Sequence, residues 1–329
     1  MLDFKLHIID INPHFYVKCI MPNVALVLTD NFPILSLTLV SEPLRVANRE
    51  LARADWRWTA LSTQGGPLKS SSGIEVPTTS LGNQPYDIVL LISSYAPEKA
   101  LGTTLLAWLR KQSRMGSMMG CIDTGAMIFA EAGLLTGTAA AVHFEALRGY
   151  QERYQGQMFI DRMFDISQTM CSSAGGVATF DMTLALIERY NGRDLSLRVA
   201  EILTYRPTEH SGPQQKMMTD TAISRLNPTL GRAVDLMLAH IQTPLDIETI
   251  CNRINAPKWT LNRLFRRHLK QTPAAYYRYL RLSQAKNLLL NSSYQISEIG
   301  NLCGFENPES FARAYLRLFG TTASKTRGK

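Results

Sequence analysis

The chain has 329 residues, of which 45% are apolar, as is ordinary for a soluble globular protein of about two domains. No apolar run approaches the roughly 18 residues that a membrane helix needs, which excludes a membrane-spanning protein. The five cysteines are scattered and odd in number, which argues against a disulfide framework and against a zinc site. We therefore expect a reduced, cytoplasmic protein without a metal or other cofactor.

The net charge of +8 is unevenly distributed along the chain. Residues 226–329 contain 15 Lys or Arg and 6 Asp or Glu, whereas residues 1–225 contain 20 and 21. All the excess positive charge therefore lies in the last third, as expected when a nucleic-acid-binding domain follows a neutral one. A basic surface without a particular partner is the alternative.

The N-terminal part predicts alternating strands and helices. Residues 1–20 lack the pattern of a secretory signal and are treated as an extension, with Met21 as an alternative start of translation. Residues 24–30 and 86–93 are short, apolar and β-branched, as strands buried on both faces are. Helical periodicity is found at 35–51, 103–113, 124–135 and in the later part of 172–192. This order predicts a parallel sheet covered on both sides, in a domain spanning 21–205.

The chain changes character after this domain. Residues 206–227 are rich in Pro, Gln, Ser, Thr and Met and show little periodicity, which predicts a linker. From residue 228 to residue 329 every segment has helical period, so we expect an all-α second domain.

Two segments of the basic domain repeat one another. Residues 247–269 and 296–319 align once one residue is inserted in the second turn, which pairs Ile250 with Ile299 and Arg263 with Arg313. Each copy predicts a short helix, a turn and a second helix, which is a helix-turn-helix motif. The apolar helical stretch between them would be a rigid spacer that aims both second helices at major-groove segments about 34 Å apart.

These motifs carry a family resemblance over about 100 residues. The segments at 263–265, 281–290 and 296–320 resemble the AraC/XylS family of transcription regulators. The first turn departs from the family pattern, because it carries Asn255 and Pro257 where a Gly-hydrophobe-Ser turn is usual. Pro fits a first helical position, so we expect a variant turn rather than a broken one.

The exposed faces of the two second helices predict the DNA contacts. Arg can bind guanine through two hydrogen bonds, Asn can bind adenine, and Glu can accept a hydrogen bond from cytosine. The candidates are Lys258, Trp259, Asn262, Arg263 and Arg266 in the first motif and Asn307, Glu309, Ser310 and Arg313 in the second. Phosphate contacts, which position without specifying, are expected from Arg266, Arg267, Lys270, Arg278 and Arg281. A solvated basic face is the alternative.

The first 205 residues resemble the PfpI-like, class I glutamine amidotransferase-like fold, which implies a flavodoxin-like domain. The resemblance rests on residues 31–48, 120–147 and 172–187. Enzymes of that superfamily place a Cys at the turn after the central strand, a His further on, and a Glu or Asp near the first helix. In this sequence those places fall on Asp123, His143 and Glu42.

A carboxylate at this turn replaces the thiolate nucleophile, and Cys121 still belongs to the strand, so we expect no enzyme. The pocket at the carboxyl end of the sheet remains as a binding site. The helix N-terminus should lower the pKa of Asp123 and keep it charged, so that with Glu42 it holds a cationic group. Thr124, His143 and Ser173 complete the candidates, with turn N–H groups for a carboxylate. Helix capping by Asp123 is the alternative.

The order of the two domains resembles a regulator subgroup whose members sense nitrogenous metabolites such as arginine, carnitine and glycine betaine. The resemblance implies a transcription regulator, in expectation an activator of catabolic genes, that binds double-stranded DNA and a small-molecule effector. A homodimer and contact with RNA polymerase are further expectations. The alternatives are a PfpI-type amidase or peptidase fused to a DNA-binding domain, and an architectural DNA-binding protein that responds to no metabolite.

Overall fold

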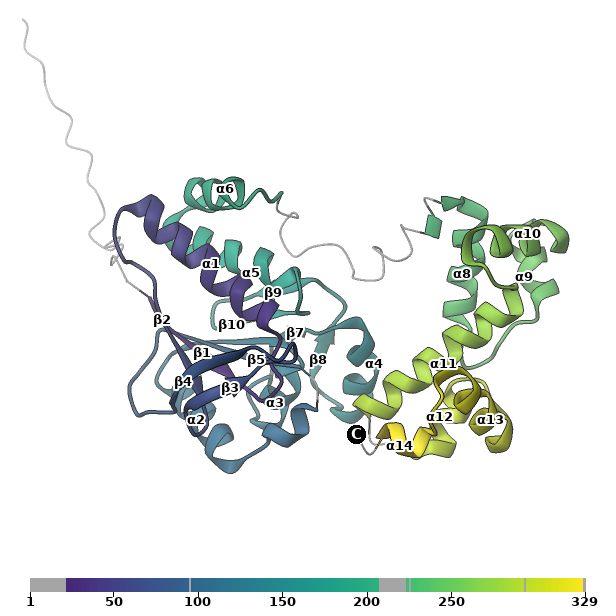
Figure 1. Cartoon of the computed structure of the whole chain (residues 1–329), viewed down its shortest axis with the longest axis horizontal. Helices are drawn as coiled ribbons and strands as arrows, with labels where there is room; N and C mark the ends of the chain where they lie inside the picture. The colour runs from purple at the N-terminus through teal and green to yellow at the C-terminus, as the bar shows by residue number, and fades with distance from the viewer. Residues whose placement is uncertain (1–21, 95, 207–222, 225, 293, 328–329) are drawn as a thin grey trace, which may run out of the picture.

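The computed structural model describes residues 22–94, 96–206, 223–224, 226–292 and 294–327 (Figure 1). Within them the chain forms an α/β domain followed by a helical domain, in agreement with the predicted fold class. The expected extension at 1–20 and most of the expected linker at 206–227 lie outside the described residues. No helix in the described part of the chain is long and apolar enough to cross a membrane.

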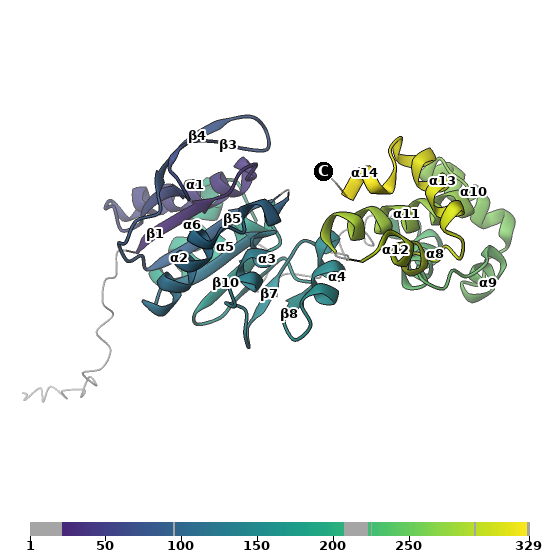
Figure 2. The same cartoon turned by 90° about the horizontal axis from the view of Figure 1, so that it is seen from below.

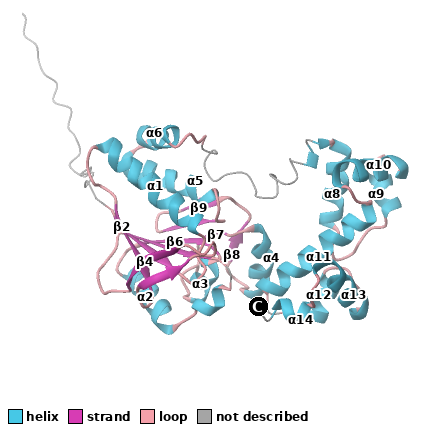
Figure 3. Cartoon of the chain, viewed as in Figure 1, coloured by secondary structure: helices cyan, strands magenta, loops and turns pink. Residues whose placement is uncertain are grey.

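The α/β domain is built on an eight-stranded sheet. Its strands are β1 (Asn23–Leu28), β2 (Arg57–Ser62), β3 (Gly66–Lys69), β4 (Glu75–Ser80), β5 (Ile88–Ser93), β6 (Met118–Asp123), β9 (Phe164–Ile166) and β10 (Met170–Ser173). Their order is β3-β4-β2-β1-β5-β6-β10-β9, and only the outermost strands, β3 and β9, pair antiparallel. Figure 3 shows the strands in magenta among the helices of this domain. A separate parallel pair consists of β7 (Ala139–Ala141) and β8 (Met158–Ile160).

Helices cover both faces of this sheet (Figure 1). One face carries α1 (Ile34–Leu51), α5 (Ala178–Asn191) and α6 (Arg193–Ile202), and the other carries α2 (Thr103–Arg114), α3 (Gly125–Glu131) and α4 (Phe144–Arg153). Side chains alternate along β1, so that Leu26 packs in the core with α1 and α5 while Val27 packs in the core with α2 and α3. Burial on both faces explains why the central strands are apolar throughout.

The helical domain contains the predicted repeat. Its helices are α8 (Pro228–Ala239), α9 (Ile247–Arg253), α10 (Lys258–Leu269), α11 (Pro273–Asn291), α12 (Ile296–Leu302), α13 (Pro308–Phe319) and α14 (Ala323–Arg327). The two copies match, because α9 and α12 have 7 residues each and α10 and α13 have 12 each. The connection spans 254–257 in the first copy and 303–307 in the second, which places the extra residue where the alignment puts it.

The turns of the two motifs have related backbone conformations. Asn255 has a φ of 53° and Gly304 a φ of 74°, so each turn contains a residue in the left-handed region. Asn is among the residues that adopt this region most readily after Gly. The first turn is therefore a variant of the second, as expected, with Pro257 preceding α10 as its N-cap residue.

The two domains meet at one end of the spacer helix. Figures 1 and 2 both show the C-terminal end of α11 beside α4, and the two helices are in contact. Just after α11, Tyr294 lies near Glu152 of α4, and the charge of that carboxylate acts with burial to raise the pKa of the Tyr294 hydroxyl. The spacer helix thus joins the two helix-turn-helix motifs and also touches the α/β domain.

Candidate functional site

A cleft of about 430 Å³ lies at the carboxyl ends of β5 and β6. From the α/β domain it is lined by polar side chains of three segments: Ser94 and Glu98 after β5, Asp123 and Thr124 after β6, and His143 and Glu145 at the start of α4. In parallel α/β sheets this edge is where ligands bind. The sequence prediction of a pocket at this edge agrees with the geometry.

Asp123 is the last residue of β6 and has a φ of 59°, a conformation in which few residues other than Gly are found. The 173–176 turn packs closely against it, because a Cβ atom added to Gly175 would lie 2.9 Å from the Asp123 Cβ. Such strain is typical of positions that the surrounding structure holds for a functional reason.

The electrostatic prediction for Asp123 is wrong. Burial raises the pKa of Asp123 to about 7, and the charge of Glu145 acts in the same direction. Hydrogen bonds from the Ser94 side chain and the Thr124 backbone oppose this rise without cancelling it. Desolvation of the carboxylate therefore outweighs the helix N-terminus, and Asp123 titrates near neutral pH.

The capping alternative is also wrong. The N-cap residue of α3 is Thr124, and it makes no side-chain capping bond. Its hydroxyl instead donates to the backbone oxygen of Ser94 at 2.5 Å, which ties the end of β6 to the end of β5. The Asp123 carboxylate therefore lies at the cleft and does not cap α3.

His143 is the N-cap residue of α4. Its Nδ1 accepts a hydrogen bond from the Glu145 backbone N–H at 3.4 Å, which requires an unprotonated Nδ1. Burial lowers the pKa of His143, although Glu145 opposes this. The lowered pKa favours the neutral imidazole, and the bond accepted by Nδ1 favours the form with its proton on Nε2.

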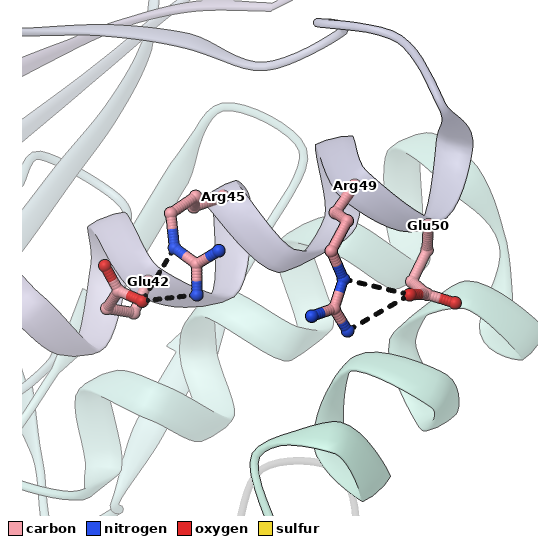
Figure 4. A network of polar contacts seen from close by, with 4 residues as sticks. All are labelled: Glu42, Arg45, Arg49 and Glu50. Atoms are coloured by element: carbon pink, nitrogen blue, oxygen red, sulfur yellow. Dashed lines mark hydrogen bonds and ion pairs between the residues drawn. The ribbon is translucent and has the colours of Figure 1, made fainter.

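Two of the predicted residues lie outside the cleft. Glu42 is half exposed on α1, where its carboxylate pairs with Arg45 at 2.8 Å (Figure 4). Ser173 is fully buried, and its hydroxyl lies 3.3 Å from the Thr179 hydroxyl and accepts a hydrogen bond from the Gly175 N–H. The structure thus brings together Asp123, Thr124 and His143, and leaves Glu42 and Ser173 elsewhere.

Three polar cleft residues of the α/β domain were missed by the sequence reasoning. Ser94 directly follows a predicted strand, at the same sheet edge as Asp123, and Glu145 follows His143 by two residues. Their positions in the sequence could have indicated that both residues lie at the cleft. Glu98 lies in the short 3₁₀ helix η1 (Pro97–Ala100), which carries no periodicity that would have indicated it.

The side chains of the first motif that are predicted to contact DNA lie on the solvent-exposed face of α10. Lys258, Arg263 and Arg266 are exposed, and Trp259 is 63% exposed. The Arg263 guanidinium lies over the Trp259 ring, 5.0 Å from its centroid. Asn262 donates its side-chain amide back to the Lys258 backbone oxygen at 3.0 Å. A shallow groove on the outer face of α10 is lined by Trp259, Asn262, Arg263, Arg266 and Arg267.

The second motif presents a similar face on α13. Glu309 and Arg313 are exposed, and Arg313 is the sixth residue of its helix, as Arg263 is in α10. Asn307 is the N-cap residue, since its side-chain oxygen accepts from the Glu309 N–H at 2.8 Å. The Ser310 hydroxyl donates to the Asn307 backbone oxygen at 2.7 Å. Asn307 and Ser310 therefore fix the start of the helix, while Arg313 stands free on its outer face.

One expected phosphate contact has a structural role instead. Arg281 donates from Nε to the Cys303 backbone oxygen at 2.8 Å and from Nη2 to the Gly304 backbone oxygen at 2.6 Å. Its guanidinium also lies 4.2 Å from the centroid of the Phe305 ring. Arg281 was expected from the sequence to contact DNA because a sequence shows the charge of a residue but does not show which groups it contacts in the fold.

Comparison with known proteins agrees with both domains. Residues 26–189 match the DJ-1/PfpI family and residues 250–329 match a helix-turn-helix domain. The chain is 34% identical to the HTH-type transcriptional regulator CdhR of Pseudomonas aeruginosa, over 91% of this chain and 90% of CdhR. It is 32% identical to the HTH-type transcriptional regulator GbdR of the same species, over 91% of this chain and 82% of GbdR.

The likeness extends to a more distant regulator and to a solved structure. The HTH-type transcriptional regulator GlxA of Rhizobium meliloti is 28% identical, over 92% of this chain and 95% of GlxA. The crystal structure of an AraC family transcriptional regulator from Pseudomonas putida superimposes with a TM-score of 0.51 at 26% identity, over 55% of this chain and 99% of that chain. The chain therefore belongs to the AraC/XylS family of DNA-binding transcription regulators, in the subgroup with an N-terminal DJ-1/PfpI domain.

Proposed function

We propose that this regulator binds a small nitrogenous metabolite in the cleft of its DJ-1/PfpI domain and that this binding changes its action at a promoter. The observation that carries the proposal is the cleft itself, which holds a carboxylate, Asp123, where the enzymes of the superfamily hold a thiol. Two more carboxylates, Glu98 and Glu145, line the same cleft. A cationic nitrogen is the group that this arrangement favours.

The chemistry of Asp123 suits a sensor of cations. A positive charge in the cleft stabilises the ionised form of a carboxylate that is otherwise half protonated at neutral pH. Binding of the cation therefore releases a proton, and its affinity rises with pH through about 7. The neutral His143 can donate a hydrogen bond from Nε2 without repelling the cation.

We also propose that the domain has no catalytic role, against the alternative of an amidase or peptidase. Cys121 is fully buried in the core that β6 forms with α2 and α3, and burial raises the pKa of its thiol far above the usual range. A buried neutral thiol is a poor nucleophile. Turnover of amide or peptide substrates that Asp123→Ala abolishes would contradict this part of the proposal.

For DNA recognition we propose Arg263 and Arg313 as the base-reading residues, because they occupy the same position in the two helices and both are exposed. Lys258, Trp259, Asn262, Arg266 and Glu309 lie on the same faces and complete the contact surface. Asn307 and Ser310 orient α13 through their capping bonds. The specific site is then read by direct contacts in two successive major-groove segments.

The proposal includes a cytoplasmic homodimer that activates catabolic genes through contact with RNA polymerase. Two copies related by a two-fold axis would bind an operator with matching symmetry. Light scattering of the purified protein gives the oligomeric state, and a reporter gene with and without the metabolite gives the sign of regulation. A monomer, or repression of the reporter, would contradict these two parts.

The test of metabolite binding is thermal stabilisation of the full chain across amino acids, amines and betaines. A ligand at about 100 times its Kd adds about 2.7 kcal/mol to the free energy of unfolding, which is a readable shift in Tm. We expect at least one cationic compound to stabilise the wild type and Glu42→Ala, whose carboxylate is outside the cleft, but not Asp123→Ala. Equal stabilisation of all three proteins would contradict the assigned site.

A further inference from the structure

One side of the cleft at Asp123 is formed by the helical domain. Leu290, near the end of α11, and Arg327, at the end of α14, are among its lining residues. A second cleft of about 240 Å³ shares Pro97, Glu98 and these two residues with the first. The two clefts are therefore adjacent parts of one groove between the domains.

The second part of the groove contains hydrogen-bond donors that lack acceptors. Among the described residues, the Nε and Nη2 atoms of Arg327 and the hydroxyl of Tyr150 are buried without a hydrogen-bond partner. Tyr150 is 2% exposed, and both residues line this part of the groove. Burying such groups unpaired is unfavourable, and more so when the group is charged. An acceptor that binds there would remove this cost.

The groove thus has two chemically different ends. Asp123 and Glu145 line only the part at β6, and Tyr150 lines only the second part, whereas Glu98 and Arg327 line both parts. Burial raises the pKa of Tyr150, so its hydroxyl stays protonated and remains a donor. Arg153, which also lines the second cleft, has its guanidinium paired with Glu131 at 3.2 Å. Arg327 is therefore the cation available to a ligand at this end.

We propose that the effector is a zwitterion that bridges the two domains, with its cationic nitrogen at Asp123 and its carboxylate on Arg327 and the Tyr150 hydroxyl. The proposal rests on the metabolite binding proposed above and adds to it the class of ligand and a binding residue from the DNA-binding domain. Arg binds carboxylates through two parallel hydrogen bonds, which explains why this residue type suits that end.

A bridging ligand couples the metabolite to DNA binding. It binds more tightly when α14 is docked over the cleft than when the domains are apart, so it shifts the population toward the docked arrangement. The contact of α11 with α4 holds the same arrangement. Because α11 also carries both helix-turn-helix motifs, docking restrains the direction in which their recognition helices face.

The test compares ligands that differ only in the group that Arg327 would hold. Glycine betaine is compared with choline, and L-arginine with agmatine, by titration calorimetry on the full chain. The proteins are the wild type, Arg327→Ala, Tyr150→Phe, and Lys325→Ala as the matched control, since Lys325 is an exposed cation of the same helix that does not line the groove.

We expect the carboxylate-bearing compound of a pair to bind the wild type and Lys325→Ala at least about tenfold more tightly than its partner, as charge-assisted hydrogen bonds give. In Arg327→Ala this preference should disappear, and in Tyr150→Phe it should fall severalfold. Retention of the preference in Arg327→Ala, or its absence from the wild type, would overturn the bridging site while binding itself still supports the sensor. Absence of binding by all four compounds would overturn the proposed sensor and this inference together.

Discussion

At the scale of single residues, Asp123 is the most informative position. Its φ of 59° and its buried carboxylate are both unfavourable, and the protein keeps them at the mouth of a cleft. A residue that serves stability alone would be replaced by Gly or Asn at such a turn. The strained turn and the buried carboxylate both support the proposed role of Asp123 in binding a ligand.

The first prediction concerns the pH dependence of stability. The unfolded chain releases the Asp123 proton near pH 3.8 and the folded chain near pH 7, so ionisation of this residue lowers the stability of the wild type progressively between those values. In Asp123→Asn this loss is absent. The difference in free energy of unfolding between variant and wild type should grow by about 2 to 4 kcal/mol from pH 4 to pH 8.

Urea denaturation of both proteins at several pH values measures this difference. Comparison of the two proteins cancels the titration of all other groups. A difference that stays constant from pH 4 to pH 8 would show that Asp123 titrates at the same pH in the folded and unfolded chains, and that its carboxylate is well solvated.

The second prediction concerns base recognition. Arg313→Ala should weaken binding to the specific operator by about 1 to 3 kcal/mol and relax one base position, and Arg313→Lys should restore charge without restoring that preference. Fluorescence anisotropy with specific and random duplexes separates the two effects. An equal loss on both duplexes would identify Arg313 as a phosphate contact.

The sequence predicted part of the site at this scale. Asp123 and His143 were identified through the resemblance to the PfpI-like superfamily, and Thr124 is the neighbour of Asp123 at the same turn. The rise in the pKa of Asp123 was missed, because burial of a side chain depends on elements far away in the sequence. Arg327 was missed for the same reason, since 204 positions separate it from Asp123 and nothing local indicates that they share a cleft.

At the scale of elements, sequence periodicity predicted the helices better than the strands. The starts of α1 and α2 lie within one residue of the predicted positions. The hairpin of β3 and β4 was not predicted, because these strands are largely exposed and each contains a proline, Pro67 and Pro77. Exposed strands that contain proline lack the apolar alternation on which such a prediction depends.

The third prediction compares the turns of the two helix-turn-helix motifs. Gly304→Ala should destabilise the helical domain by more than about 2 kcal/mol, since its φ is 74° and a Cβ would lie 2.6 Å from the Ile241 backbone oxygen. Asn255→Gly, at the corresponding place in the first turn, should change stability by less than about 1 kcal/mol. Denaturation followed by circular dichroism measures both. Similar effects of the two substitutions would contradict the role assigned to the turns.

The fourth prediction separates two arginines of α11. Arg281→Ala removes two hydrogen bonds to the turn before α13 and should lower the free energy of unfolding by about 2 to 3 kcal/mol. Arg278 is exposed, so Arg278→Ala should leave stability unchanged and reduce the slope of log Kd against log salt by about 1. If Arg281→Ala is folded and its slope of log Kd against log salt is also reduced, Arg281 contacts DNA and the structural role assigned to it is contradicted.

At the scale of the whole molecule, the charge distribution and the domain contact have separate roles. The excess positive charge of residues 226–329 gives affinity for any duplex, which depends strongly on salt. The contact of α11 and α14 with the α/β domain can make that affinity depend on a metabolite. The sequence predicted the first property from composition alone. Dependence of the affinity on a metabolite requires a contact between the two domains. The sequence predicted the spacer helix but not the contact that this helix makes with the α/β domain.

The most direct test of the account is a binding cycle with the full chain, its operator duplex and a metabolite that stabilises it. Calorimetry gives the Kd of the metabolite with and without DNA, and anisotropy gives the Kd of the operator with and without metabolite. The account predicts that each ligand changes the affinity of the other by the same factor, about fivefold or more, and that Arg327→Ala reduces this factor toward one. Affinities that are independent of one another in the wild type would contradict coupling between the cleft and the DNA-binding domain.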